Sequence, residues 1–158
     1  MNPAFVILLA FGIGVVAGLR SMTAPAVVAW AAHLGWIYLS GSPLAFVGSR
    51  WAVGIFTLAA LGEFVADLLP TTPARTSAFP LMVRVVVGFL TGACLAVGGG
   101  VSLWFGGISG SAGAIAGTFG GYYARAGLVR TLRVADAMIA IPEDAIAVAL
   151  GLILVSRF

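Results

Sequence analysis

The sequence predicts an all-α integral membrane protein, folded as a compact polytopic bundle of about six short transmembrane helices in one domain spanning residues 1–158. Hydrophobic residues make up 61 % of the chain and charged residues only 8 %, whereas a soluble domain carries about 25 % charged residues. A chain this small cannot hide that much apolar surface from water. Its apolar runs also approach the roughly 20 residues that a spanning helix needs. These observations exclude a soluble globular domain, a disordered chain and a nucleic-acid-binding module.

The first half of the chain contains three apolar runs separated by loop signals. The run 4–19 lacks the basic stretch that begins a signal peptide, so we expect it to remain as the first span. The second run, 23–39, ends at a Ser-Gly-Ser-Pro loop, 40–43. The third run, 51–69, ends at the polar segment 70–77, which is the clearest linker in the chain.

The second half predicts three more elements. The run 81–103 is the fourth span, and 136–155, interrupted by Pro142, is the last. Between them lies the glycine-rich segment 106–125. Glycine is tolerated in membrane helices, so this segment is either a fifth span or a broken or re-entrant helix. Three spans in each half, 1–78 and 79–158, would give oppositely oriented halves, so an inverted repeat is a further hypothesis.

The arginines predict the orientation, because cytoplasmic loops carry an excess of basic residues. The chain has no lysine and eight arginines. The loops after spans one, three and five carry Arg20, Arg75, Arg84, Arg125, Arg130 and Arg133, and the other side carries Arg50 and Arg157. This asymmetry places both termini outside the bacterial cytoplasmic (inner) membrane. Three tryptophans then fall at the outer interface, as an aromatic belt would: Trp36, Trp51 and Trp104.

With this topology all five carboxylates fall on the side of the six arginines. The candidate binding residues for an ion or another charged group are Arg20, Glu63, Asp67, Arg84, Glu143 and Asp144. A charge inside a span costs about 2.5–3.5 kcal/mol on insertion scales, so such charges pair or line a wet cavity. Three interpretations stay open: a structural ion-pair network, a polar vestibule that binds an ion or a charged headgroup, and interfacial side chains without mutual contact.

Glycine spacing gives a second signal. Gly113, Gly117 and Gly121 recur every four residues, and Gly14 and Gly18 form a single such step. This spacing predicts close helix packing, either within the bundle or between copies of a homo-oligomer. The alternative is a pore-lining broken helix whose exposed amide groups face an anion.

Other chemistry has little support. The one cysteine, Cys94, and the one histidine, His33, both lie in apolar runs and are expected to be packed. We expect no cofactor and no metal site, although the carboxylates leave a hard-cation site as an alternative. No nucleophile elbow, phosphate loop or zinc motif is present. We expect a protein that is not an enzyme, with an intramembrane enzyme acting on lipid headgroups as a minor alternative.

Three motifs carry a family resemblance. They are Gly18-Leu19-Arg20, Glu63-Phe-Val-Ala-Asp67-Leu-Leu-Pro70 and Pro142-Glu143-Asp144-Ala145. Together they resemble the small bacterial membrane family called domain of unknown function 4126, across nearly the whole chain. The family more often has a lysine at the position of Leu68. The resemblance implies the helical membrane architecture and the choice of charged residues, and it implies no activity.

The leading functional hypothesis is a small transporter or channel-like protein that moves an ion or small charged solute through the Arg/Glu/Asp residues. Carboxylates would bind a cation or carry protons, and arginines would hold an anionic group or tune the carboxylate pKa values. The alternative is a non-transporting scaffold or accessory subunit whose charges are structural. Expected partners are membrane lipid and further copies of the chain, without nucleic acid.

Overall fold

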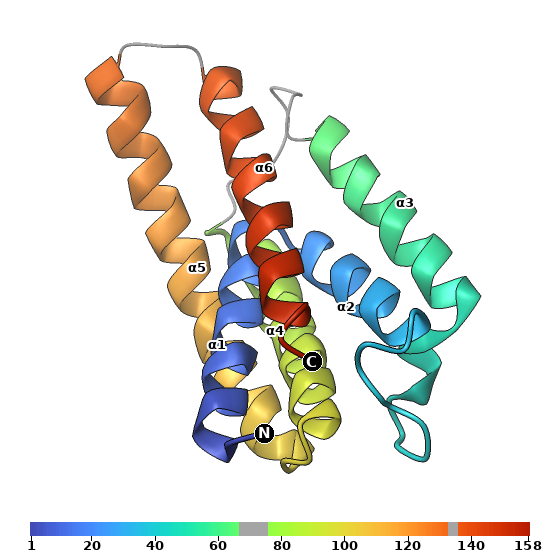
Figure 1. The fold of residues 1–158 in the computed structure, drawn as a ribbon. Coiled ribbons are helices and arrows are strands. Elements are labelled where there is room, and N and C mark those ends of the chain that lie inside the picture. The colour runs from blue at the N-terminus through green and yellow to red at the C-terminus, as the bar shows by residue number, and fades with distance from the viewer. Residues whose placement is uncertain (67–75, 133–135) are drawn as a thin grey trace.

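The computed structural model describes residues 1–66, 76–132 and 136–158. Within them the chain forms six α-helices, one short 3₁₀ helix and no strand, which confirms the all-helical prediction (Figure 1). The elements are α1 (Pro3–Leu19), α2 (Thr23–His33), η1 (Ala45–Gly48), α3 (Arg50–Ala66), α4 (Ala78–Gly98), α5 (Leu103–Leu132) and α6 (Asp136–Val155). Successive α-helices alternate in direction, and both termini lie at the same end of the bundle.

The centre of the bundle is built from α1, α4 and the first part of α5, which pack against one another more extensively than any other helices do. Helix α6 packs on α1 and α2, and α3 lies at the edge, mainly against α2 and η1 (Figure 1). The core therefore lies around α1, while α3 is held by fewer neighbours than the central helices.

Glycines explain why the three central helices pack so closely. A Cβ atom added at Gly14 of α1 would collide with the carbonyl of Gly110 in α5. One added at Gly88 of α4 would lie 2.7 Å from that same carbonyl oxygen. Gly110 is therefore the point at which α1, α4 and α5 meet. Such close backbone approach is typical of small-residue packing between membrane helices.

The predicted ladder lies at this interface as well. A Cβ atom at Gly113 or Gly117 would collide with carbonyls of α1, and one at Gly18 would lie 2.6 Å from the Thr118 amide nitrogen. Gly121 is also buried. The close backbone contacts at Gly14, Gly18, Gly113 and Gly117 agree with the predicted helix packing within the bundle. Helix α5 runs unbroken from Leu103 to Leu132, so the alternative of a broken helix is wrong, while a re-entrant arrangement stays a prediction.

Two helix ends differ from the sequence prediction. Helix α2 stops at His33 although the apolar run continues to Leu39, because Gly35 adopts a positive φ of 79°. The Trp36 amide then donates to the Ala31 carbonyl at 2.8 Å and closes the helix end. The fourth helix likewise ends at Gly98, before a turn in which Gly100 has φ 74°.

Two of the helices are long and apolar enough to cross a membrane, among the residues that the structure describes. They are α4 and the segment Met138–Val155 of α6. Helix α1 is apolar throughout but shorter, with 17 residues. Helix α5 has the length, at 30 residues, but its many glycines lower its mean hydropathy.

Candidate functional site

The turn between α1 and α2 carries the most deeply buried charge of the described residues. Arg20 follows α1 directly, and its amide donates to the Val16 carbonyl at 2.8 Å. Its side chain is fully buried, at 0 % exposure, and the guanidinium lies 5.8 Å from the ring centre of Phe64 on α3. Because α2 begins at Thr23, only three residues form this turn. The short connection places the guanidinium inside the bundle.

Helix α6 supplies the carboxylate that pairs with this guanidinium. Asp144 forms an ion pair with Arg20, and the neighbouring Glu143 pairs with Arg125 of α5 at 3.3 Å. Both carboxylates follow Pro142, which lies inside the helix. Proline has no amide hydrogen, so the Met138 carbonyl lacks its usual helical donor one turn before the charged pair. This part of α6 is therefore more polar than the rest of the helix.

Helix α3 supplies Glu63, which binds the same turn from the other side. Its Oε1 accepts from the Ser21 amide at 2.9 Å and from the Ser21 hydroxyl at 2.6 Å. Its Oε2 accepts from the Met22 amide at 2.8 Å. The Arg84 guanidinium of α4 lies 4.0 Å from Oε1. The Met22 side chain makes no capping bond to α2, and the carboxylate from α3 binds the two backbone amides that immediately precede the helix.

These residues form what we call the charge cluster. It consists of Arg20, Glu63, Arg84, Arg125, Glu143 and Asp144. Five of these six were predicted from the sequence. The sixth predicted residue, Asp67, lies outside the described residues. The cluster lies where α1 ends, towards the end of the bundle opposite the two termini (Figure 1).

Sequence reasoning missed Arg125 as a site residue and missed the amides of Ser21 and Met22. The arginine was counted with the basic residues at the end of the fifth span and was not named as a site residue, whereas α5 continues as a helix beyond it. The continuous helical spacing of α5 was a signal that could have placed Arg125 near the other charges. No composition signal marks a backbone amide, although a serine next to an intramembrane arginine is an indication of a polar turn.

The carboxylates of the cluster face arginines rather than one another. In the described parts of the chain, no group of three or more His, Cys, Asp or Glu side chains is placed to hold a metal ion. Asp144 is 21 % exposed while its partner Arg20 is 0 % exposed. The acidic members are thus nearer to solvent than this central arginine. The arrangement is suited to holding or exchanging charged groups by hydrogen bonds and ion pairs.

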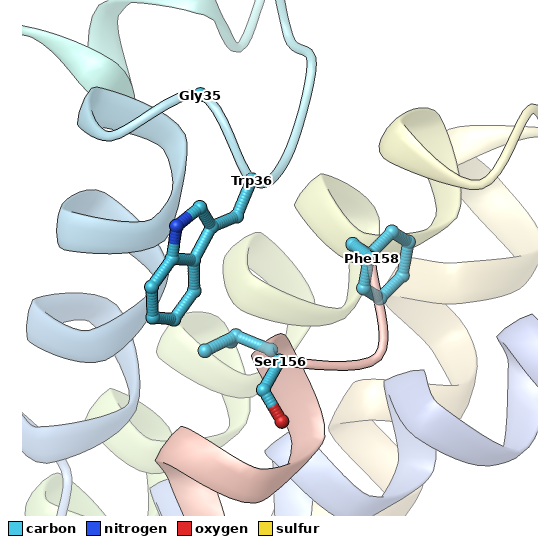
Figure 2. A pocket seen from close by; sticks show the side chains of 5 residues that line it. Gly35, Trp36, Ser156 and Phe158 are labelled. Atoms are coloured by element: carbon cyan, nitrogen blue, oxygen red, sulfur yellow. The ribbon is translucent and has the colours of Figure 1, made fainter.

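A pocket of about 400 Å³ lies elsewhere, at the end of the bundle that holds the termini. It is lined by Gly35, Trp36, Val155, Ser156 and Phe158. Figure 2 shows the Trp36 indole and the Phe158 ring on different sides of Ser156. None of these five described residues has an ionisable side chain, so the pocket lining is chemically unlike the charge cluster.

The family model described as "domain of unknown function (DUF4126)" matches residues 7–156 of this chain. The chain belongs to this family. The resemblance seen in the three sequence motifs is thereby confirmed, and the match includes the whole charge cluster. A search of curated proteins and a search of solved structures found no match to the DUF4126 chain. Family membership supports the helical architecture and leaves the activity to be argued from the site.

Proposed function

We propose that this DUF4126 protein crosses the bacterial cytoplasmic membrane with six helical segments and moves an ion or a small charged solute through the charge cluster. The observation that carries the proposal is Arg20, a fully buried guanidinium at the meeting point of helices, flanked by carboxylates that remain partly exposed. Intramembrane charges are expensive and typically mark substrate, ion or proton pathways.

The exposed surface supports a lipid environment. Large apolar side chains form an outward stripe on α3 at helical spacing: Trp51, Ile55, Leu58, Leu61 and Val65. Monomeric soluble proteins rarely expose a continuous apolar surface of this kind. Helix α2 has 11 residues, or about 16 Å, and is too short to cross the membrane alone. The segment 34–49, with buried Ile37 and Val47, would complete that crossing.

The aromatic residues of α5 support a position for the charge cluster within the thickness of the bilayer. Trp104 is the second residue of α5, and the edge-to-face pair Tyr122 and Tyr123 lies about 28 Å further along that helix, close to the hydrocarbon thickness of a bilayer. The Thr118 hydroxyl contacts the Gly18 carbonyl near the end of α1, so this level lies about 7 Å inside the second aromatic level. The turn that holds Arg20 would therefore lie within the inner leaflet, near the cytoplasm.

The test is ion and proton flux in proteoliposomes, first under an imposed pH gradient and then under an imposed potential. We expect flux with the wild type and at least a tenfold loss with Glu63→Gln and with Asp144→Asn. Arg50→Gln is the matched control, because Arg50 is an exposed charge at the opposite end. Absence of flux from wild-type protein shown to be folded would refute simple ion or proton conduction.

A scaffold or accessory subunit is the second candidate function, and one observation favours it. Each described carboxylate of the cluster is close to an arginine on a different helix, as a purely structural network would require. A scaffold predicts that Glu63→Gln changes stability and leaves the proteoliposomes as impermeable as those without protein. Flux that depends on Glu63 would exclude this alternative.

A further inference from the structure

The α1–α2 turn has the donors of an oxyanion-binding site, and a carboxylate is bound there. The two oxygens of Glu63 receive three hydrogen bonds of 2.6–2.9 Å from Ser21 and Met22. Two of the donors are backbone amides of the turn immediately before α2, near the helix end whose dipole favours negative charge. Arg84 adds a positive charge 4.0 Å away. All of these groups select an anion rather than a cation.

A further donor in this turn is not used by Glu63. Thr23, the first residue of α2, is 2 % exposed, and its Oγ1 has no hydrogen-bond partner within the described chain. A buried hydroxyl without a partner is costly, because it has lost its hydrogen bonds to water. The binding of Glu63 alone therefore leaves one polar group of the turn unsatisfied. An additional anion oxygen near the start of α2 would satisfy it.

The carboxylate that occupies the turn is attached to a helix with few neighbours. Helix α3 packs mainly on α2 and η1, and a Cβ atom added at Gly54 or Gly62 would meet open space. Glu63 lies one turn before Ala66, the last described residue of α3. Movement of this end would release the turn without disturbing the tightly packed α1, α4 and α5.

From these observations we infer that Ser21 and Met22 of the α1–α2 turn, together with Thr23 at the start of α2, form the binding site for a small carboxylate anion, which displaces Glu63. This inference rests on the proposed transport function and names its solute class. Glu63 is an internal competitor that fills the site when the solute is absent. The exchange replaces one carboxylate with another, so the charge beside Arg84 is preserved.

The first experiment empties the site. Glu63→Ala in detergent should show a lower Tm than the wild type, and formate or acetate at millimolar concentration should restore it. Chloride at the same ionic strength is the control and should not restore the Tm. We expect Thr23→Val to weaken formate binding to the Glu63→Ala protein by about tenfold, the effect of one charge-assisted hydrogen bond. The same Thr23→Val change in the wild type should leave Tm unlowered, since Thr23 does not hold Glu63.

The second experiment uses the intact site and avoids dependence on a destabilised variant. Spin labels at Leu61→Cys on α3 and Tyr123→Cys on α5, both exposed positions, report the separation of these helices in a Cys94→Ser background. Formate should broaden or lengthen the distance distribution, and chloride should leave it unchanged. Glu63→Ala with the same labels should show the broad distribution without formate.

The outcomes separate this inference from the proposed function. Equal rescue by chloride, no rescue of a folded Glu63→Ala protein, or rescue by phosphate but not by formate would overturn the carboxylate site. Unchanged label distances in formate would overturn the displacement of Glu63. Formate binding without formate flux in proteoliposomes loaded with formate would refute carboxylate transport and leave the site standing. Flux that is insensitive to both formate and Thr23→Val would overturn the carboxylate site and leave the proposed transport function standing.

Discussion

The three-helix crossing at Gly110 gives the sharpest prediction about stability. A methyl group at this position would collide with the carbonyl of Gly88 and lie 3.0 Å from the Cα atom of Gly92. These are backbone atoms of α4, so no side-chain rotation relieves the overlap. Gly110→Ala therefore forces α5 away from α4, and with it from α1. The matched control is Gly120→Ala on the same helix, where an added Cβ atom would meet nothing within 4 Å.

The magnitude follows from two contributions. Both substitutions gain the same helix propensity, at most about 1 kcal/mol, because alanine is the better helix former. Only Gly110→Ala adds overlap, and overpacking in a tight core costs about 1–3 kcal/mol. Because the overlapped atoms are backbone, we expect the upper value. The propensity contribution cancels in the comparison, so the control should be more stable than Gly110→Ala by about 3 kcal/mol.

The assay is reversible unfolding in mixed micelles, followed by far-UV circular dichroism as the fraction of denaturing detergent rises. Size-exclusion chromatography checks that each variant starts folded. A difference of less than about 1 kcal/mol between the two variants, below the overpacking range, would refute the assignment of Gly110 to the closest helix crossing. So would a Gly110→Ala protein that is more stable than the control.

Two further predictions concern the charges and the orientation. Arg20→Ala and Asp144→Ala should each cost about 3–5 kcal/mol of unfolding free energy, as breaking a buried ion pair does, and the double variant should cost less than their sum. Additive losses in the same unfolding assay would contradict direct pairing. In a Cys94→Ser background, Ser40→Cys should react with an impermeant thiol reagent added to whole cells, and Thr131→Cys should not. The opposite labelling pattern would reverse the proposed orientation.

The sequence was sufficient for the elements whose ends coincide with changes in polarity. The last apolar run predicts a helix from Asp136 to Val155, and α6 has these bounds. Hydropathy failed at the second run, because Ile37 and Leu39 are buried without being helical. Hydropathy averaged over a run of residues indicates burial, and it cannot detect the turn at Gly35 within that run. It likewise could not show that α5 continues as far as Leu132.

For the site, sequence predicted which charges gather but not how they pair. The positive-inside argument and helical spacing placed Arg20 and Asp144 on the same side of the bundle. Pairing depends on the rotation and depth of each helix, which packing sets. The role of Glu63 was harder to predict from the sequence, because its partners include the backbone amides of Ser21 and Met22. Backbone donors become visible only when the turn that exposes them is known. The inverted repeat stays a prediction, although the helices it would equate, α2 and α5, have 11 and 30 residues.

The uneven packing of the helices should also set the rates at which their amide hydrogens exchange with solvent. Amide hydrogens near the glycine contacts of α1, α4 and α5 are enclosed by backbones in close contact, so their exchange with solvent deuterium requires opening of the core. Helix α3 is held mainly by α2 and η1 and, at one end, by the hydrogen bonds from the α1–α2 turn to its Glu63. Exchange should therefore proceed in two separated phases, with α3 in the fast one. The molecule would behave as a rigid three-helix body with one helix that opens on its own timescale.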